Sequence, residues 1–333
     1  MRRIDVLAAG LLSTVQDGGR HGHAASGVGS AGAMDAAALR LANLLVGNAA
    51  DAAGLEITLR GPQLRFSHDT LLAITGGTLE AHCNGMPVPA WRPVLIRAGG
   101  EISFGNVRHG ARSYLAVGGG IAAPALLGSR STDINAGIGP AALAADSALE
   151  CGAPTARARA LLAELLPNAA KRGCAAPAWQ LDPRPWFDAD TRIPIRFVAG
   201  RHFPQLDNAA QRALCGADWR IGAASNRVGY RLEGPPLTLR EPPQLISEGV
   251  QPGTVQLPPG GAPIVLMAEA PTCGGYPRIA QVVGVDLARL AQRRPGDSLR
   301  FAETSLEDAQ TRYLLRERAL IRIARHIAER MHA

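Results

Sequence analysis

A glycine-rich loop in the last third of the sequence is the first candidate for chemistry. It reads Thr272-Cys273-Gly274-Gly275-Tyr276-Pro277 and follows an apolar run, Pro263 to Ala268, that is expected to be a buried strand. Two adjacent glycines free the backbone to turn its N–H groups toward a ligand oxygen. The loop is therefore predicted to hold a small anion.

A second polar segment is Gly128-Ser129-Arg130-Ser131-Thr132. Hydroxyls and a guanidinium placed so close together can bind a carboxylate or a phosphate. A polar turn without a ligand is an equally good interpretation of the same residues.

A third segment, Ser225 to Leu232, contains an amide, two arginines and a phenol. On an extended strand, Asn226 and Tyr230 would share one face. Arg227 and Arg231 would share the opposite face. The alternative is a half-exposed strand whose arginines are solvated.

Other kinds of site have little support. His21 and His23 lie near Asp17, but their glycine-rich stretch lacks an HExxH or CxxC framework, so a flexible loop is favoured and no metal is expected. Gly118-Gly119-Gly120 is expected to be a tight turn, because no GxGxxG opens a helix there. Without a GxSxG elbow, a catalytic Cys/His signature or a close pair of acids, triad hydrolysis and glycosidase-type chemistry are not indicated.

The charged residues exclude further classes. The 333-residue chain has a formal net charge of +7, and Lys171 is its only lysine. The surroundings of Lys171 fit neither a Walker A loop, nor a Schiff base, nor a biotin attachment site. The arginines are spread along the chain rather than gathered in a stripe with aromatic residues, so no nucleic-acid partner is expected.

The cysteines and the apolar runs indicate the cellular compartment in which the protein is expected. Five cysteines lie far apart with no CxxC pair, which indicates reduced thiols in a chain without a signal peptide. No window approaches the ~18 apolar residues that a membrane helix needs. A soluble, cytoplasmic protein with no membrane partner is expected. The cysteines are Cys83, Cys151, Cys174, Cys215 and Cys273.

The elements that must position these segments are mostly short strands. The 38 glycines and 24 prolines break the chain into short pieces and favour strands joined by turns. With few helices between the strands, an antiparallel sheet that closes on itself is expected, and the fold class is mainly β with some helices. Strands are expected at Ile4–Leu7, Leu55–Leu59, Gln63–Phe66, Leu71–Thr75, Val94–Arg97, Glu101–Phe104, Ser113–Val117, Ile193–Val198 and Thr254–Leu257.

Helical patterns and shifts in composition suggest the domain organisation. Met34 to Val46 has the spacing of one helical face, and Gly47 should end that helix. A first β unit is expected over residues 1–154 and a second over 193–302. Residues 155–192 form an Ala/Arg/Pro-rich connector whose helix, Ala156 to Leu166, is expected to be solvated. Residues 303–333 form an amphipathic helix that should pack on the barrel or a partner chain.

Long segments in order along the chain resemble one family. It is the biotin-dependent carboxyltransferase family, which includes the C subunit of 5-oxoprolinase, the subunit 2 type of allophanate hydrolase proteins, urea amidolyase-related proteins and KipA. The match runs from about residue 11 to 301 and leaves out the tail after 303. The matching segments are Thr14–Arg20, Gly32–Asp35, Arg40–Asn48, Leu55–Glu56, Gly61–Pro62, Tyr114–Gly120, Gly128–Thr132, Ser225–Arg227, Gly229–Gly234, Ser247–Gly249, Gly274–Pro277 and Arg294–Asp297.

The resemblance implies two cyclophilin-like β-barrel units and a sister subunit, which is of the KipI type or the B subunit of 5-oxoprolinase. A third protein of the LamB/YcsF type, the A subunit of 5-oxoprolinase, is often present. Together the three use ATP to open the lactam of 5-oxoproline, a small amide, to glutamate. In the carboxyltransferase members the matching region holds carboxybiotin and urea. Both tasks require a site that stabilises an amide-like oxygen as negative charge develops on it.

The leading hypothesis is therefore the C subunit of an ATP-dependent 5-oxoprolinase, a hydrolase subunit that is inactive without its partners. ATP acts at the level of the complex, because nothing in this chain resembles a known nucleotide loop. The first alternative is a carboxyltransferase component, which moves CO2 from carboxybiotin to urea or a similar amide. Its biotin would have to come on another chain. The second alternative is a KipA-like regulatory protein that binds a sister inhibitor protein.

The family match supports whole segments, and side-chain chemistry suggests the roles within them. Asp35 is the expected catalytic residue of the first unit. Asn226, Arg227 and Tyr230 are expected to be catalytic in the second. Substrate or anion binding is expected from Gln16, Ser129, Arg130, Thr132, Thr272, Gly274, Gly275 and Tyr276.

The sequence also departs from the family pattern. Before Gly-Gly-Tyr-Pro the family usually has Asp, any residue, Gln, Thr, Thr, whereas this chain has Glu269-Ala270-Pro271-Thr272-Cys273. Pro271 in place of Gln removes a side-chain amide and a backbone donor together. The change points to an altered substrate or a reduced activity. Ala31 also stands where the family commonly has Ser.

Overall fold

The computed structural model describes residues 2–170, 172–188, 190–241 and 245–331, so Lys171 lies outside the described residues. The chain forms two compact units. Unit 1 comprises Met1–Gly19, Asp35–Asp188 and Ala319–Ala333, and unit 2 comprises Arg20–Met34 and Ala189–Arg318. The boundaries expected at residues 154, 192 and 302 stay a prediction.

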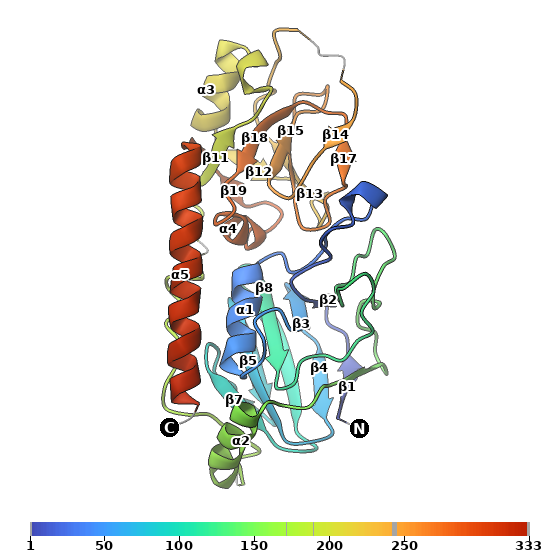
Figure 1. Ribbon diagram of the computed structural model, residues 1–333, viewed down its shortest axis with the longest axis vertical. Coiled ribbons are helices and arrows are strands. Elements are labelled where there is room, and N and C mark those ends of the chain that lie inside the picture. The colour runs from blue at the N-terminus through green and yellow to red at the C-terminus, as the bar shows by residue number, and fades with distance from the viewer. Residues whose placement is uncertain (1, 171, 189, 242–244, 332–333) are drawn as a thin grey trace. The chain divides into compact units, whose positions relative to one another are not determined.

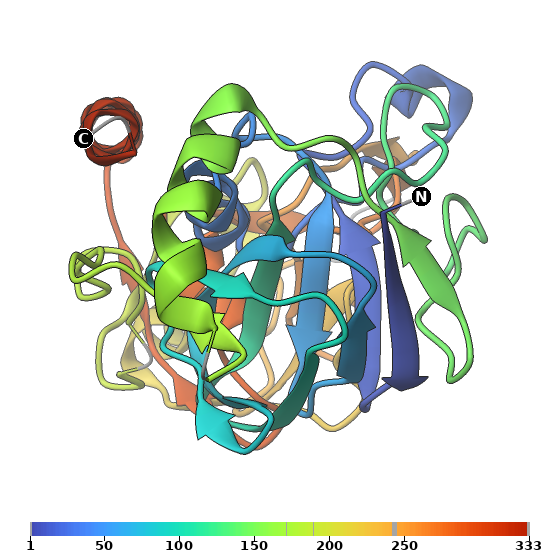
Figure 2. The same ribbon diagram turned by 90° about the horizontal axis from the view of Figure 1, so that it is seen from below.

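Unit 1 is built on a ten-stranded antiparallel sheet that curves into a barrel-like form (Figure 2). The main order is β10-β7-β5-β8-β4-β1-β9, with β3 also paired to β8, β2 paired to β3, and β6 paired to β5. The strands are β1 (Arg3–Ala8), β2 (Leu12–Gln16), β3 (Gly54–Thr58), β4 (Gln63–Phe66), β5 (Thr70–Cys83), β6 (Met86–Pro87), β7 (Pro93–Ile96), β8 (Glu101–Val117), β9 (Ala148–Glu150) and β10 (Cys174–Ala175).

The two longest strands, β5 and β8, correct a prediction. Glu101–Phe104 and Ser113–Val117 were expected to be separate strands, but they are the two ends of β8. The expectation was wrong because glycine was taken as a break. Gly76 in β5 (φ 79°) and Gly110 in β8 (φ 80°) instead lie in long strands whose pairing shifts register several times. Such bulges bend a strand without ending it, which helps a sheet to curve.

Helix α1 (Ala36–Leu45) contacts β5 and β8 and was predicted within two residues at its start. Asp35 caps its N-terminus by accepting a hydrogen bond from the Ala38 N–H (3.1 Å). Gly47 follows in the left-handed conformation (φ 74°), as expected for a residue just beyond a helix.

Helix α2 (Ala156–Ala169) differs from the solvated connector that its Ala/Arg composition suggested. Ala158, Leu161 and Leu165 are buried and belong to an apolar cluster with residues of α1 and the sheet. The helix also continues through Pro167, because a proline in the last turn removes only one helical hydrogen bond. Composition alone concealed the apolar spacing.

Helix α5 (Leu306–Arg330) carries the C-terminal amphipathic pattern. Its C-terminal half packs on unit 1: Leu320 joins one buried apolar cluster, and Ile327 with the following Met331 joins another. Leu306 and Tyr313, which continue that seven-residue spacing toward the start of the helix, are exposed. Within the described part of the chain, no helix is long and apolar enough to cross a membrane.

Unit 2 contains an eight-stranded sheet with the order β19-β12-β13-β16-β15-β18-β11-β20, in which only β11 and β20 are parallel. A separate pair joins β14 to β17 (Figure 1). The fold predicted from the sequence, mainly β with two barrel-like units, is confirmed. The elements are β11 (Ile195–Ala199), α3 (Asn208–Gly216), β12 (Trp219–Ile221), β13 (Gly229–Glu233), β14 (Glu248–Gly249), β15 (Thr254–Gln256), β16 (Ile264–Leu266), β17 (Cys273–Gly274), β18 (Arg278–Val282), α4 (Leu287–Ala291), β19 (Ser298–Leu299) and β20 (Phe301–Glu303).

Candidate functional site

In unit 1, the polar turn at residues 128–132 surrounds the carboxylate of Asp17, which follows β2. Asp17 Oδ1 accepts hydrogen bonds from Ser129 Oγ and Ser131 Oγ, both at 2.6 Å. Its Oδ2 accepts one from the Arg130 N–H (2.6 Å). Burial raises the pKa of Asp17, but these hydrogen bonds outweigh burial and lower the pKa below its usual value. The turn therefore already holds an anion, and that anion belongs to the protein.

Two neighbours of this turn are also engaged. Gln16 is completely buried, and its Nε2 donates to Thr14 Oγ1 and to the Thr132 carbonyl, each at 3.0 Å. Thr132 Oγ1 donates to the Pro140 carbonyl (2.8 Å). Among the expected anion-binding residues of unit 1, Arg130 alone is exposed. Ligand binding at this turn stays a prediction, and the Arg130 guanidinium is the group that a ligand would reach first.

Asp35, the expected catalytic residue of unit 1, lies in a buried polar network. Its N–H donates to Tyr114 Oη (2.7 Å), and Tyr114 Oη donates to Glu56 Oε2 (2.8 Å). Arg112 lies beside the same carboxylate, with Nε at 3.5 Å from Glu56 Oε1. Burial, then the charges of Glu56 and Asp35, raises the pKa of Tyr114 well above its usual value. Tyr114 therefore stays protonated and can donate to Glu56.

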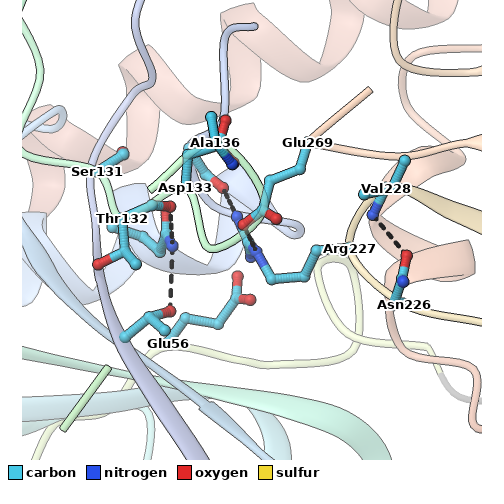
Figure 3. Close-up of polar contacts among 12 residues, drawn as sticks. Glu56, Ser131, Thr132, Asp133, Ala136, Asn226, Arg227, Val228 and Glu269 are labelled. Carbon is cyan, nitrogen blue, oxygen red and sulfur yellow. Dashed lines mark hydrogen bonds and ion pairs between the residues drawn. The ribbon is translucent and has the colours of Figure 1, made fainter. Parts of the chain in front are cut away.

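In unit 2, the expected polar strand begins later than predicted. β13 starts at Gly229, and Asn226 lies in the turn before it, where its Oδ1 accepts a hydrogen bond from the Val228 N–H (2.9 Å; Figure 3). The prediction that Asn226 and Tyr230 share a strand face was therefore wrong. An asparagine side chain that accepts a hydrogen bond from the N–H two residues later stabilises a turn rather than an extended chain.

Arg227 is the best-anchored of the expected catalytic residues. Its side chain is 4% exposed, and Nε donates to Glu269 Oε1 at 2.6 Å (Figure 3). Its Nη2 donates to the Gly32 carbonyl (2.7 Å), while the Glu269 N–H donates to the Arg227 carbonyl (2.9 Å). The alternative of a solvated arginine at this position was wrong. The pair ties the turn before β13 to the segment that leads into the glycine loop.

Tyr230 also faces the interior of unit 2. It is 3% exposed, and its Oη donates to the Arg293 carbonyl at 3.3 Å. Its catalytic role stays a prediction, and the geometry shows a phenol that stabilises the core of the unit.

The glycine loop is partly a strand, because Gly274 and Cys273 in β17 pair with β14. Neither Gly274 nor Gly275 has a positive φ, so the expected conformational freedom is not what requires glycine here. A Cβ on Gly274 would lie only 2.3 Å from Gln256 Nε2, so the end of the Gln256 side chain would have to move to admit a larger residue. Tyr276 is 46% exposed and Thr272 half-buried, so both side chains are open to a ligand.

Several polar residues of unit 2 were not predicted from the sequence to belong to a site. Gln256 is 5% exposed, and its Nε2 has no hydrogen-bond partner among the described residues. A cavity of about 380 Å³ lies nearby in the sheet and is lined by residues 200–201, 249–251, 254, 278 and 280–281. Its charged lining residues are Arg201 and Arg278. These residues are brought together from three strands, so no local motif could reveal them.

The described residues offer little that fits a nucleotide or a metal. Side chains already occupy the N-termini of α1, α2, α3 and α5, through Asp35, Thr155, Asp207 and Ser305. A phosphate bound at a helix N-terminus would need those N–H groups. In the same part of the chain, no group of three His, Cys, Asp or Glu side chains is placed to hold a metal ion. The geometry therefore gives no support to ATP binding by these residues.

Comparisons with known proteins give a consistent result. A family model described as carboxyltransferase domain, subdomain A and B, matches residues 26–303. The C subunit of 5-oxoprolinase from Escherichia coli K12 is 39% identical over 307 residues, which cover 92% of this chain and 93% of that protein. The protein of the same name from Haemophilus influenzae is 35% identical over 309 residues, with the same coverage.

A comparison with solved structures also finds a urea amidolyase, at lower sequence identity. The crystal structure of the K. lactis urea amidolyase matches with a TM-score of 0.80 and 27% identity, and the match covers 96% of this chain. It covers 20% of the amidolyase chain, so this chain spans about one fifth of that protein.

Proposed function

The chain belongs to the carboxyltransferase family whose model comprises subdomains A and B, and from this premise we propose that it is the C subunit of an ATP-dependent 5-oxoprolinase. The observation that supports the proposal most directly is the share of each relative's length that aligns with this chain. The two relatives that are named as the C subunit of 5-oxoprolinase align over 93% of their own length, whereas the match to the K. lactis urea amidolyase covers 20% of that protein. The chain thus aligns with nearly the full length of the relatives of the first kind.

The proposed reaction opens the lactam of 5-oxoproline to glutamate. A lactam carbonyl is a poor electrophile, and phosphoryl transfer from ATP to its oxygen would create a good leaving group. Water then attacks the ring carbon and the C–N bond breaks, with a proton passing to the nitrogen, which leaves an acyl phosphate. A second water hydrolyses the acyl phosphate to glutamate and inorganic phosphate. The site must stabilise negative charge on the amide oxygen, which the exposed Thr272–Tyr276 loop is suited to do with hydroxyl and N–H donors.

Within this chain, we assign different tasks to the buried and exposed residues. Arg227 and Glu269 position the loop rather than contact the substrate, because both are buried and paired with each other. Thr272, Cys273, Gly275 and Tyr276 are the loop residues that a substrate can reach. ATP would be bound mainly by another protein of the complex, since the helix N-termini described above are already occupied.

The assembly and the compartment follow from the same proposal. The partners are a sister protein, of the KipI type or the B subunit of 5-oxoprolinase, and a LamB/YcsF-type protein, the A subunit. We also propose a cytoplasmic location, which the five free cysteines support because thiols stay reduced in the cytosol.

A second candidate is a carboxyltransferase component. The K. lactis urea amidolyase match, with its TM-score of 0.80, favours it. The biotin would be carried by another chain, because the surroundings of the only lysine in the sequence, Lys171, do not resemble a biotin attachment site.

Co-purification and activity assays separate the two candidates. The chain is co-expressed with the sister protein and the LamB/YcsF-type protein, and glutamate is measured after addition of 5-oxoproline and ATP. We expect turnover with all three proteins and loss of turnover when any one is left out. A complete complex without turnover contradicts the leading proposal, and CO2 transfer from carboxybiotin to urea would support the second.

A further inference from the structure

The cavity of unit 2 has more positive charge than its own acids neutralise. Arg201 Nη1 donates to Glu248 Oε1 (2.8 Å), and Arg278 Nη2 donates to Glu248 Oε2. Two guanidinium groups therefore share one carboxylate, which leaves a net charge of +1. No acidic residue is among those that line the described cavity.

The two arginines also have donors to spare. Each guanidinium has five N–H donors. In the described residues, Arg201 uses only Nη1 for protein contacts, and its side chain is 70% exposed. Arg278 is more fixed, because its Nη1 also donates to the Gly249 carbonyl (3.1 Å) and its side chain is 28% exposed. One anchored and one adaptable guanidinium thus face the same cavity.

A buried histidine shows the sign of the local potential. His202 Nδ1 accepts a hydrogen bond from the Arg278 N–H (3.0 Å). Burial, followed by the charges of Arg278 and Arg201, lowers the pKa of His202, and the opposite effect of Glu248 is smaller. The arginines therefore dominate the electrostatics around the cavity.

The remaining lining supplies neutral polar groups. Thr254 Oγ1 donates to Gln281 Oε1 (3.0 Å), and Gln281 Nε2 donates to the Pro252 carbonyl (2.9 Å). These hydrogen bonds fix two neutral polar side chains in the lining of the cavity. The Gln251 side chain has no hydrogen-bond partner in the described part of the chain, so its amide can both donate to and accept from a ligand.

We propose that this cavity binds a small carboxylic acid, with Arg201 and Arg278 holding the carboxylate. A planar carboxylate suits the paired donors of a guanidinium better than a point charge would. Resting on the proposed function, the ligand is 5-oxoproline, which has one carboxylate and a neutral lactam for the Gln251 amide. Arg278 directly follows the Gly274–Pro277 segment, and β14 pairs with β17, so the cavity adjoins the exposed loop.

The first test measures binding by the full chain alone. Isothermal titration calorimetry with 5-oxoproline is compared with the uncharged amide 5-oxoprolinamide and with inorganic phosphate. We expect binding of the acid and much weaker binding of the other two. No binding of 5-oxoproline, or equal binding of the amide or of phosphate, overturns the proposal.

Two arginine variants then test whether Arg201 binds the carboxylate of 5-oxoproline. Arg201→Gln is expected to weaken 5-oxoproline binding about tenfold, because a charge-assisted contact is lost. Its exposure makes misfolding unexpected, and an unchanged melting temperature checks this. Arg300→Gln is the control, because Arg300 is an exposed arginine of unit 2 that pairs with Asp218 away from the cavity. Equal affinities for Arg201→Gln and the control contradict the assignment.

The complete complex distinguishes this inference from the proposed function. If the complex turns over 5-oxoproline, Arg201→Gln should raise KM about tenfold and leave kcat within about twofold. Turnover with an unchanged KM overturns the cavity assignment but leaves the proposed function standing. Absence of turnover overturns the function, while the calorimetry still decides whether the cavity binds a carboxylate.

Discussion

Each unit has one buried carboxylate close to its candidate site, and the two carboxylates are stabilised by different kinds of hydrogen-bond donor. In unit 1, neutral hydroxyls and backbone N–H groups surround Asp17. In unit 2, the guanidinium of Arg227 faces Glu269. Removing one neutral donor leaves the Asp17 carboxylate with its other donors, whereas removing Arg227 leaves Glu269 buried without its cation. The two clusters should therefore respond to mutation with different severity.

The largest effect is expected from Arg227→Ala. Breaking a buried ion pair by removing one partner costs about 3–5 kcal/mol, because the Glu269 carboxylate stays buried without the guanidinium that faced it. The free energy of unfolding, measured by urea denaturation, should fall by about that amount. The double variant Arg227→Leu with Glu269→Leu should recover much of the loss. A small loss for Arg227→Ala alone would contradict the interpretation of the pair as structural, and would make Arg227 a candidate for substrate contact again.

An intermediate and pH-dependent effect is expected from Ser129→Ala. The variant loses one charge-assisted hydrogen bond to Asp17, which is worth about 1.5–3 kcal/mol. The folded-state pKa of Asp17 is lowered, so its contribution is present above the unfolded pKa and is lost as pH falls through the folded pKa. The stability difference from wild type should therefore be largest near neutral pH and should narrow as the pH falls below the ordinary aspartate pKa of about 3.9.

Urea denaturation at several pH values checks that prediction. Ser147→Ala is the matched control, because Ser147 is only half-buried and its Oγ donates to a backbone carbonyl, that of Ala144, rather than to a carboxylate. A difference for Ser129→Ala that stays constant from pH 7 to pH 2 would show that Asp17 is not the source of the effect.

Local patterns predicted the elements of the fold better than they predicted the contacts of the site. Periodicity and capping were enough for α1, and turn residues were enough for most strands. They failed for β8, because a glycine that ends a strand and a glycine that bulges within one look the same in sequence. The distinction depends on the neighbouring strand.

The site illustrates the same limit more strongly. The turn at residues 128–132 was singled out as able to hold a ligand anion, whereas the anion found in it is Asp17, which lies more than a hundred residues away in sequence. Arg227 was singled out for its charge, yet its partner Glu269 is 42 residues away. Residue types show what a segment can bind. Only the long-range pairing shows that the protein supplies the ligand itself.

The smallest effect is expected at the two buried tyrosines, which offer a further comparison between the units. Tyr230→Phe removes a 3.3 Å hydrogen bond to the neutral Arg293 carbonyl and should cost less than about 1 kcal/mol. Tyr114→Phe removes both the donor to the buried Glu56 carboxylate and the acceptor of the Asp35 N–H, and should cost about 1–3 kcal/mol. Both changes keep the ring and its packing, so urea denaturation of the two variants compares the hydroxyls directly. Equal losses would show that the charge of Glu56 does not set the cost, and a larger loss for Tyr230→Phe would assign its hydroxyl more than the core contact described above.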